Sequence, residues 1–310
     1  MLLPDVKNEK IIFAALNWGK GHVARSIGLI QQLLAQGNEL IIAGDDSQLA
    51  IFKVYFPLIE IIQIEPYPFE FSGNGNFSKD LIRSRKLLKK QLQKDRDFLE
   101  LAMSELNFTL VISDHRYGFY SKKCTSIFVT HQLNLALNWW SKPAQIIHEA
   151  YLKMFDNIWV MDDSLSSLAG KLSKSKNRKH VSYIGHFSRF MNNNIIRPIG
   201  KLDVVICNGP QPYDEHLFLR YKNDLDKIII CPDHLFQKYN RKNLVSAKNW
   251  KVCDEVIMRA TRIYAFCGYS TLMDLKFLTC DYQLIPTKGQ TEQEYLFELM
   301  NATKPPHNLI

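Results

Sequence analysis

The first fifty residues alternate between apolar runs and helical patterns. The continuous apolar run Ile11–Leu16 predicts a strand covered on both faces. Apolar residues then recur at helical spacing over 23–34, and Gly37 ends that helix. Another apolar run follows at 40–44. This order predicts a βαβ unit with parallel strands and a right-handed crossover.

The same alternation continues along the chain. Apolar runs predict further strands at 59–64, 110–114, 126–130, 158–161, 203–207, 227–231, 262–266 and 282–285. Helical spacing predicts a long helix at 80–106 and shorter helices at 270–278 and 292–301. Strands that alternate with helices are typical of a doubly wound α/β sheet.

The elements fall into two series. We expect one α/β domain over residues 1–190, a second over 201–310, and a hinge at about 186–201. Residues 171–179 are rich in Ser, Lys and Arg, which predicts an exposed loop.

Composition limits the function classes. The net charge of +8 favours anionic partners. The six cysteines include no C-x-x-C pair, which argues against a zinc site and favours a reducing cytoplasm. The sequence has no apolar run long enough for an ordinary membrane-spanning helix. Its first ten residues are too polar for a secretory signal.

Polar residues gather where predicted strands end. Gly19, Gly21 and His22 follow the first strand, where glycine turns let backbone N–H groups approach an anion. The loop 267–271 follows a later strand in the same way. Its serine can alternatively be a plain helix N-cap. Asp45 and Asp46 lie beyond the second strand and keep a nicotinamide cofactor open as an alternative.

Five segments in order resemble the GT-B glycosyltransferases. They are Asn17–His22, Thr130–Asn134, Ile184–Arg189, Gly268–Asp274 and Pro286–Gln293. Together they resemble the UDP-N-acetylglucosamine-dependent transferases that act on lipid intermediates of peptidoglycan. The resemblance implies an α/β GT-B fold, with two Rossmann-like doubly wound domains facing each other across a cleft. Compared with that family, the second domain is short at its C-terminus.

The resemblance also implies site residues. The second domain would bind the donor, with Asp274 on the ribose and the two glutamines near the sugar. The first domain would bind the acceptor, with His22 as the catalytic residue. The donor set is Arg189, Gly209, Gly268, Ser270, Thr271, Asp274, Gln290 and Gln293. The acceptor set is Gly19, Gly21, Asp114, His115, Arg116, His131 and Asn134.

The expected chemistry is a single displacement that inverts the anomeric carbon. A neutral His22 would take the proton of the acceptor hydroxyl. The sequence has no Asp-x-Asp, so we expect neither a metal nor another cofactor besides the UDP-sugar. A helix-capping or packing role for His22 stays open. Asp114 and Arg116 can alternatively pair with each other to hold their loop.

The basic stretch 80–96, with Trp139 and Trp140, favours contact with an anionic membrane surface. We therefore expect a cytoplasmic protein that also binds the inner face of the membrane and uses a lipid-linked or glycan acceptor. A solvated helix with buried aromatic residues is the alternative. No motif supports nucleic-acid binding.

Two other function classes remain open from sequence. One is a nucleotide-sugar epimerase or hydrolase on the same fold. The other is a catalytically inactive protein that binds nucleotide sugars, a possibility that rests on Lys20 in the first glycine loop and the short C-terminus.

Overall fold

The computed structural model describes residues 3–69, 72, 77–136, 142–176, 178–192, 200–209 and 212–303. It divides into two compact units. Unit 1 comprises Met1–Glu70 and Ser78–Met191, and unit 2 comprises Phe71–Phe77 and Asn192–Ile310. Part of the expected hinge, 193–199, lies outside the described residues, as do Trp139 and Trp140.

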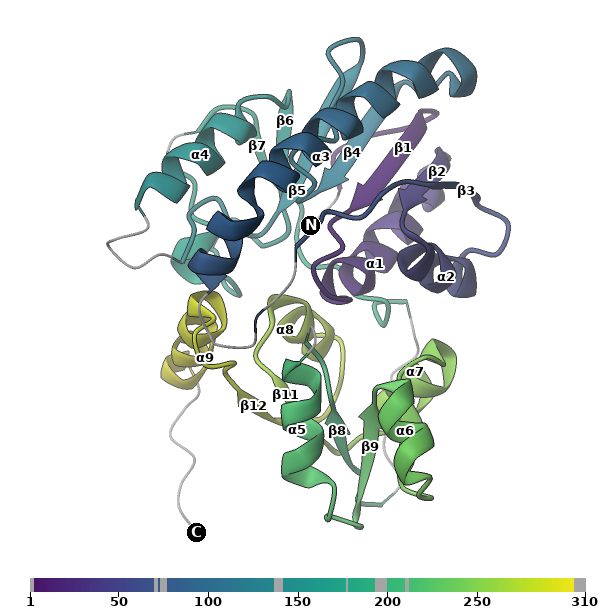
Figure 1. The fold of residues 1–310 in the computed structure, drawn as a ribbon, viewed down its shortest axis with the longest axis vertical. Coiled ribbons are helices and arrows are strands. Elements are labelled where there is room, and N and C mark those ends of the chain that lie inside the picture. The colour runs from purple at the N-terminus through teal and green to yellow at the C-terminus, as the bar shows by residue number, and fades with distance from the viewer. Residues whose placement is uncertain are drawn as a thin grey trace. The chain divides into compact units, whose positions relative to one another are not determined.

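Unit 1 is built on a parallel sheet of seven strands in the order β3-β2-β1-β4-β5-β6-β7 (Figure 1). Its central strands are mostly apolar, and beyond their first residues they are buried, as expected for a parallel sheet with helices on both faces. The strands are β1 (Lys10–Ala15), β2 (Glu39–Gly44), β3 (Glu60–Gln63), β4 (Leu110–Asp114), β5 (Thr125–Thr130), β6 (Asn157–Val160) and β7 (Val181–Tyr183).

Alternate residues of β1 show which helices cover each face. Ile12 shares a core cluster with Leu99 of α3, whereas the ring of Phe13 lies 6.4 Å from that of Phe52 in α2. Figure 1 shows α3 and α4 on the same side of the sheet. The helices of unit 1 are α1 (Gly21–Ala35), α2 (Asp46–Tyr55), α3 (Phe77–Leu106) and α4 (Lys142–Leu152).

Two glycines in unit 1 allow close packing. A Cβ on Gly28 of α1 would lie 2.6 Å from the carbonyl oxygen of Ser188. A Cβ on Gly118 would lie 2.5 Å from the carbonyl oxygen of Leu92 in α3. Both neighbours are backbone atoms, so these helices contact the adjacent chain at distances that other residues do not permit.

Unit 2 repeats the architecture on a smaller scale. Its five parallel strands follow the order β10-β9-β8-β11-β12. They are β8 (Asp203–Ile206), β9 (Lys227–Cys231), β10 (Leu244–Ser246), β11 (Arg262–Phe266) and β12 (Asp281–Ile285). The helices are α5 (Tyr213–Tyr221), α6 (Asp233–Tyr239), α7 (Trp250–Met258), α8 (Tyr269–Leu275) and α9 (Thr291–Thr303). A core cluster joins the central strands to α5 and α6.

The structure confirms the predicted parallel α/β architecture and corrects it in places. Sequence analysis did not predict α2, α4, β7 or β10, and it gave no bounds for α5, α6 and α7. The expected exposed loop at 171–179 is wrong in part, because Leu172 and Ser173 are fully buried. Leu172 ends a short 3₁₀ turn, and its carbonyl accepts hydrogen bonds from the backbone of Leu133 and Asn134.

Candidate active site

The site in unit 1 forms where β1 and β4 end side by side. Ala15, the last residue of β1, pairs with Asp114, the last residue of β4. The chain then turns through Gly19, whose φ of +92° favours glycine, and enters α1 at Gly21. His22, in the first turn of α1, therefore lies beside Asp114, with its Nδ1 3.1 Å from Oδ1 of the carboxylate.

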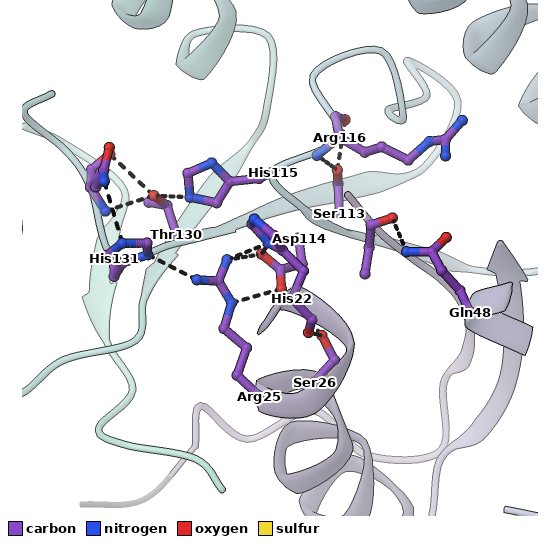
Figure 2. Close-up of polar contacts among 12 residues, drawn as sticks. His22, Arg25, Ser26, Gln48, Ser113, Asp114, His115, Arg116, Thr130 and His131 are labelled. Carbon is purple, nitrogen blue, oxygen red and sulfur yellow. Dashed lines mark hydrogen bonds and ion pairs between the residues drawn. The ribbon is translucent and has the colours of Figure 1, made fainter. Parts of the chain in front are cut away.

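Arg25 connects this pair to a second histidine. It lies one turn after His22 on α1, and its side chain is 2% exposed. Its guanidinium donates from Nε to Oδ2 of Asp114 at 2.9 Å and from Nη2 to Oδ1. Nη1 also lies 2.9 Å from Nδ1 of His131 (Figure 2). Asp114 thus receives a two-pronged, charge-assisted contact in a fully buried position.

Charge and burial set the protonation of this cluster. Burial alone would raise the pKa of Asp114, but Arg25 and His22 outweigh it and hold the pKa well below its usual range. Burial, and then the Arg25 charge, lower the pKa of His22. Burial likewise lowers the pKa of His115 well below its usual range. At neutral pH the site thus combines an ionised carboxylate with neutral imidazoles.

His115 and His131 complete the cluster. His115 follows β4 with a left-handed φ of +60°, and its ring centroid lies 5.2 Å from that of His22. Its Nε2 is 2.7 Å from the hydroxyl of Thr130, the last residue of β5. The His131 ring lies 5.7 Å from that of His115. Three predicted acceptor-side residues, Asp114, His115 and His131, therefore lie together with His22.

Arg116 does not belong to this cluster. Its side chain is fully buried and runs away from the group in Figure 2. It makes a two-pronged contact with Asp95 of α3 and donates to the carbonyl of Glu65. The predicted acceptor contact of Arg116 is wrong because the guanidinium is inaccessible, and the alternative in which Arg116 pairs with Asp114 is wrong as well, because Asp114 pairs with Arg25.

Asn134 also serves the local backbone. Its side-chain amide donates to the carbonyls of Lys171 and Lys174, and its oxygen accepts from Arg178. The amide thereby fastens the segment around the 3₁₀ turn to the end of β5. This use of the amide gives no support to the expected acceptor contact.

Sequence reasoning missed Arg25 and Ser26. The Ser26 hydroxyl lies 2.7 Å from the carbonyl of His22 and 3.2 Å from Oδ2 of Asp114. The available signal was spacing, because residues three and four apart share one face of a helix. Arg25 lies three residues after His22, on a helix whose apolar residues predict that this helix packs against the sheet.

In unit 2, polar side chains link the ends of β8 and β11. Asn208 accepts from the backbone N–H of Phe266 at 2.8 Å and donates to the Thr271 hydroxyl at 3.0 Å. Gly209, beside it, has a φ of +109°. Asn208 was not among the predicted site residues, although it follows a strand in the sequence.

The loop before α8 differs from the expectation in two details. Gly268 is the N-cap residue with a φ of −84°, so its backbone conformation is open to any residue. Ser270 lies inside α8, which excludes its expected alternative role as the N-cap. Ser270, Thr271 and Asp274 are partly exposed on this helix.

The two predicted glutamines of unit 2 contact each other. The amide of Gln293 donates to Oε1 of Gln290 at 2.7 Å and accepts from the backbone N–H of Thr287 at 3.1 Å. They therefore shape the loop between β12 and α9. Arg189, predicted to serve the donor, lies in unit 1 with its guanidinium 4.3 Å from the ring centroid of Phe190.

Two other groups have the appearance of sites. Asp162, Asp163 and His186 offer ligand atoms within 4.8 Å of one another. Asp162, however, already accepts from the Ser173 hydroxyl and from backbone N–H groups, and it contacts His186, so it holds a loop together.

A hollow of about 620 Å³ lies where β2 and β3 end. Asp45 on its wall caps α2 by accepting from the backbone N–H groups of Ser47 and Gln48, which does not favour a nicotinamide role. The hollow is lined by Asp45, Asp46, Ser47, Gln63, Ile64, Glu65 and Pro66.

Comparison with known proteins identifies the fold. A kitacinnamycin glycosyltransferase is 15% identical with a TM-score of 0.58, over 97% of this chain and 88% of that one. SsfS6, a glycosyltransferase of Streptomyces sp. SF2575, is 11% identical with a TM-score of 0.59, over 95% and 86%. Acinetobacter baumannii MurG is 11% identical with a TM-score of 0.50, over 94% and 84%.

No protein-family model and no curated protein matches the sequence. The structural likeness nonetheless shows that the chain has the GT-B fold, with two Rossmann-like units. No helix in the described ranges has both the length and the apolar character needed to cross a bilayer.

Proposed function

We propose that this chain is a glycosyltransferase that moves a sugar from a UDP-sugar such as UDP-N-acetylglucosamine to a hydroxyl of an acceptor. The observation that carries the proposal is the His22–Asp114 pair at the end of β1 in a GT-B fold. Unit 1 would bind the acceptor and supply His22, and unit 2 would bind the donor. The solved glycosyltransferases of the same fold support this class of reaction.

The chemistry follows from the contact between His22 and Asp114. When Nδ1 of His22 carries a proton and donates it to Asp114, Nε2 has a lone pair. The described residues offer no hydrogen-bond partner for Nε2. As the acceptor oxygen bonds to the anomeric carbon, its proton passes to Nε2. The bond from that carbon to the diphosphate breaks, and UDP leaves with the electron pair, which inverts the configuration.

Polar groups at the strand ends of unit 2 support donor binding. Thr271 and Asn208 meet where β8 and β11 end, and ligands of open α/β sheets bind at such ends. We propose that Gly209, Gly268, Ser270 and Thr271 contact the diphosphate, Asp274 the ribose, and Gln290 and Gln293 the sugar. Arg189 would offset the charge of the leaving group. This reaction uses no metal ion.

The test combines binding with turnover. UDP at 100 times its dissociation constant should stabilise the protein by about 2.7 kcal/mol in a thermal-shift assay. His22→Ala should lower transfer by about 10²- to 10⁴-fold and leave UDP binding intact. His234→Ala is the matched control, because His234 is half-exposed and pairs with Glu215 in unit 2. Full activity of His22→Ala would remove His22 from the mechanism.

Incubation with UDP-N-acetylglucosamine alone, followed by NMR, tests the other enzyme classes. A transferase leaves the donor largely intact until an acceptor is added. Release of free sugar would indicate a hydrolase, and a new sugar configuration would indicate an epimerase. Tight donor binding without turnover on a panel of lipid-linked and glycan acceptors would indicate an inactive binding protein.

We also propose that unit 1 binds the cytoplasmic face of an anionic membrane, where a lipid-linked acceptor would lie. The first half of α3 exposes Arg83, Lys86 and Lys89 around Ile82 and Leu87, which are 60% and 59% exposed. On the same side of the sheet, α4 exposes Ile146 and Ile147. Basic residues with exposed apolar side chains suit such a surface.

Sedimentation with vesicles tests this membrane contact. Leu87→Asp should weaken binding to vesicles that contain phosphatidylglycerol. Leu58→Asp, a change at a 97% exposed leucine that follows α2, should not. Equal binding of both variants to anionic and neutral vesicles would contradict the proposal.

A further inference from the structure

Arg25 contacts both His22 and Asp114, the two residues that the proposed reaction uses. Its guanidinium reaches both oxygens of Asp114, Nδ1 of His22 at 2.8 Å and Nδ1 of His131 at 2.9 Å. The proposed function assigns no role to this residue. A role for Arg25 in catalysis rests on the proposed function, whereas its contacts are a property of unit 1 alone.

A guanidinium carries only N–H donors, so every atom that it hydrogen-bonds must accept. Nδ1 of His131 therefore has a lone pair, and the proton of this neutral imidazole lies on Nε2. Nε2 lies 3.4 Å from the amide nitrogen of Gln132, and a half-turn of that amide brings its oxygen to the same place. Arg25 thus determines which nitrogen of His131 is protonated.

His22 is placed differently, because two groups contact the same ring nitrogen. Nδ1 lies 2.8 Å from Nη2 of Arg25, which can only donate, and 3.1 Å from Oδ1 of Asp114, which can only accept. Nδ1 of a neutral imidazole cannot accept from Arg25 and donate to Asp114 at once. In the first arrangement Nε2 carries the proton, and in the second Nε2 is able to take one.

We propose that Arg25 is a positioning residue that competes with Asp114 for Nδ1 of His22 and so decides whether Nε2 of His22 donates or accepts a proton. The shorter contact to Arg25 favours the protonated Nε2 in the protein without substrate. A substrate hydroxyl that donates to Nε2 selects the other arrangement, in which Nδ1 turns its proton to Asp114. The resting enzyme thus holds its base in an unreactive form.

In the described part of the chain four groups face His22, and of these Arg25 alone donates a hydrogen bond to its Nδ1. From β4 and the residue after it come Asp114 and His115, and from the end of β5 comes His131. Only Arg25 among these four carries a donor within hydrogen-bond distance of Nδ1. Its positive charge, next to the effect of burial, also keeps His22 neutral.

Nitrogen-15 NMR of histidine-labelled protein tests the proposal without a substrate. The His22 resonances, assigned by their loss in His22→Asn, should show an unprotonated Nδ1 and a protonated Nε2 in the wild-type protein at pH 8. A protonated Nδ1 in the wild-type protein would overturn the proposal. This arm needs no variant of Arg25 to fold.

Variants of Arg25 give the second arm. Arg25→Lys keeps a charge but loses the fork, so the proton of His22 should move to Nδ1. Arg25→Met removes the charge, so His22 should titrate about one pH unit or more higher. Arg116→Met is the matched control, since it breaks another buried pair and should leave His22 unchanged.

A purely structural Arg25 would lower the melting temperature without moving either readout. The expected NMR changes in a protein that transfers no sugar would support the role of Arg25 and refute the proposed function. If transfer is found and the acid limb of its pH profile stays in place in Arg25→Met, the proposal for Arg25 fails alone.

Discussion

Two buried arginine–aspartate pairs lie in the described part of unit 1, and they differ in what surrounds them. Arg25 and Asp114 contact the ring nitrogens of His22 and His131. In the second pair, Asp95 accepts a hydrogen bond from the hydroxyl of Tyr67 at 2.8 Å, and Arg116 donates to the carbonyl of Glu65. Both pairs use the same two-pronged geometry in a buried place.

The difference lies in what each pair can change. The contacts of Arg116 and Asp95 join α3 to the segments after β3 and β4, and Tyr67 adds a hydrogen bond from the backbone N–H of Gly118. Burial, and then Asp95, raise the pKa of Tyr67, so it stays neutral. This pair is a fixed clamp, whereas the pair at α1 contacts imidazoles whose protons can move.

Removing the carboxylate charge of each pair in turn should give the largest difference in the rate of sugar transfer. Asp114→Asn should lower sugar transfer by about 10³-fold, because His22 loses the anion that orients it and stabilises its charged form. Asp95→Asn should leave transfer per folded molecule unchanged. Steady-state kinetics corrected for the folded fraction measure both. Equal losses in the two variants would erase the distinction between them.

The free energy of unfolding in urea should measure how much the Arg116–Asp95 pair contributes to stability. Asp95→Ala leaves the Arg116 charge buried without its partner, and breaking a buried pair in this way costs about 3–5 kcal/mol of unfolding free energy. Arg96→Ala, at a partly exposed position of the same helix, serves as the control. A loss below 1 kcal/mol in Asp95→Ala would mean that water or another group already solvates Arg116.

Acid should act on the histidine side of the comparison. His22 and His115 have folded pKa values below their unfolded value near 6.5. Their contribution to stability is therefore complete above that pH and is lost as the pH falls below it, because the unfolded chain takes up protons first.

His115→Asn, which tolerates the left-handed φ, should reduce the slope of unfolding free energy below pH 6.5 by up to about 1.4 kcal/mol per pH unit. Chemical denaturation at pH 7, 6 and 5 measures that slope. An unchanged slope in His115→Asn would show that this histidine is already protonated in the folded protein.

The smallest effect is expected in unit 2, where the strand-end network is neutral. Thr271→Val removes the acceptor for the Asn208 amide and should cost about 1 kcal/mol of stability. It should also weaken UDP binding, measured by calorimetry. Thr261→Val is the control, because the Thr261 hydroxyl donates to the backbone carbonyl of Leu202 at the opposite end of β11. Stronger UDP binding in Thr271→Val would contradict the donor assignment.

The long apolar runs were enough to predict the sheets. Strands such as β1 and β4 are buried along nearly their whole length, and the apolar runs Ile11–Ala15 and Leu110–Ile112 make the pattern plain. The strands β7 and β10 have three residues each, too few for a pattern. The helix α2 begins at a capping box, in which Asp45 and Gln48 bond each other's backbone, whereas in the sequence Asp45 was taken as a possible sign of a nicotinamide cofactor.

The candidate site was only partly predictable. Gly21 and His22 follow one strand and Asp114 ends another, and these positions singled them out in the sequence. Arg25 was missed because an arginine on an amphipathic helix normally extends into solvent, and only the tertiary contact with Asp114 explains its burial. Arg116 was misassigned because position at a strand end does not say to which face of the sheet a side chain turns.

Gly28 adds a constraint of another kind. His22, Arg25 and Gly28 recur every third residue on α1, and the last of them meets the backbone of Ser188 too closely for any other side chain. A mutational scan should therefore reject even alanine at position 28. In related genes, glycine at that place should accompany the histidine and the arginine, which offers a three-letter pattern for finding distant homologues that overall similarity does not reveal.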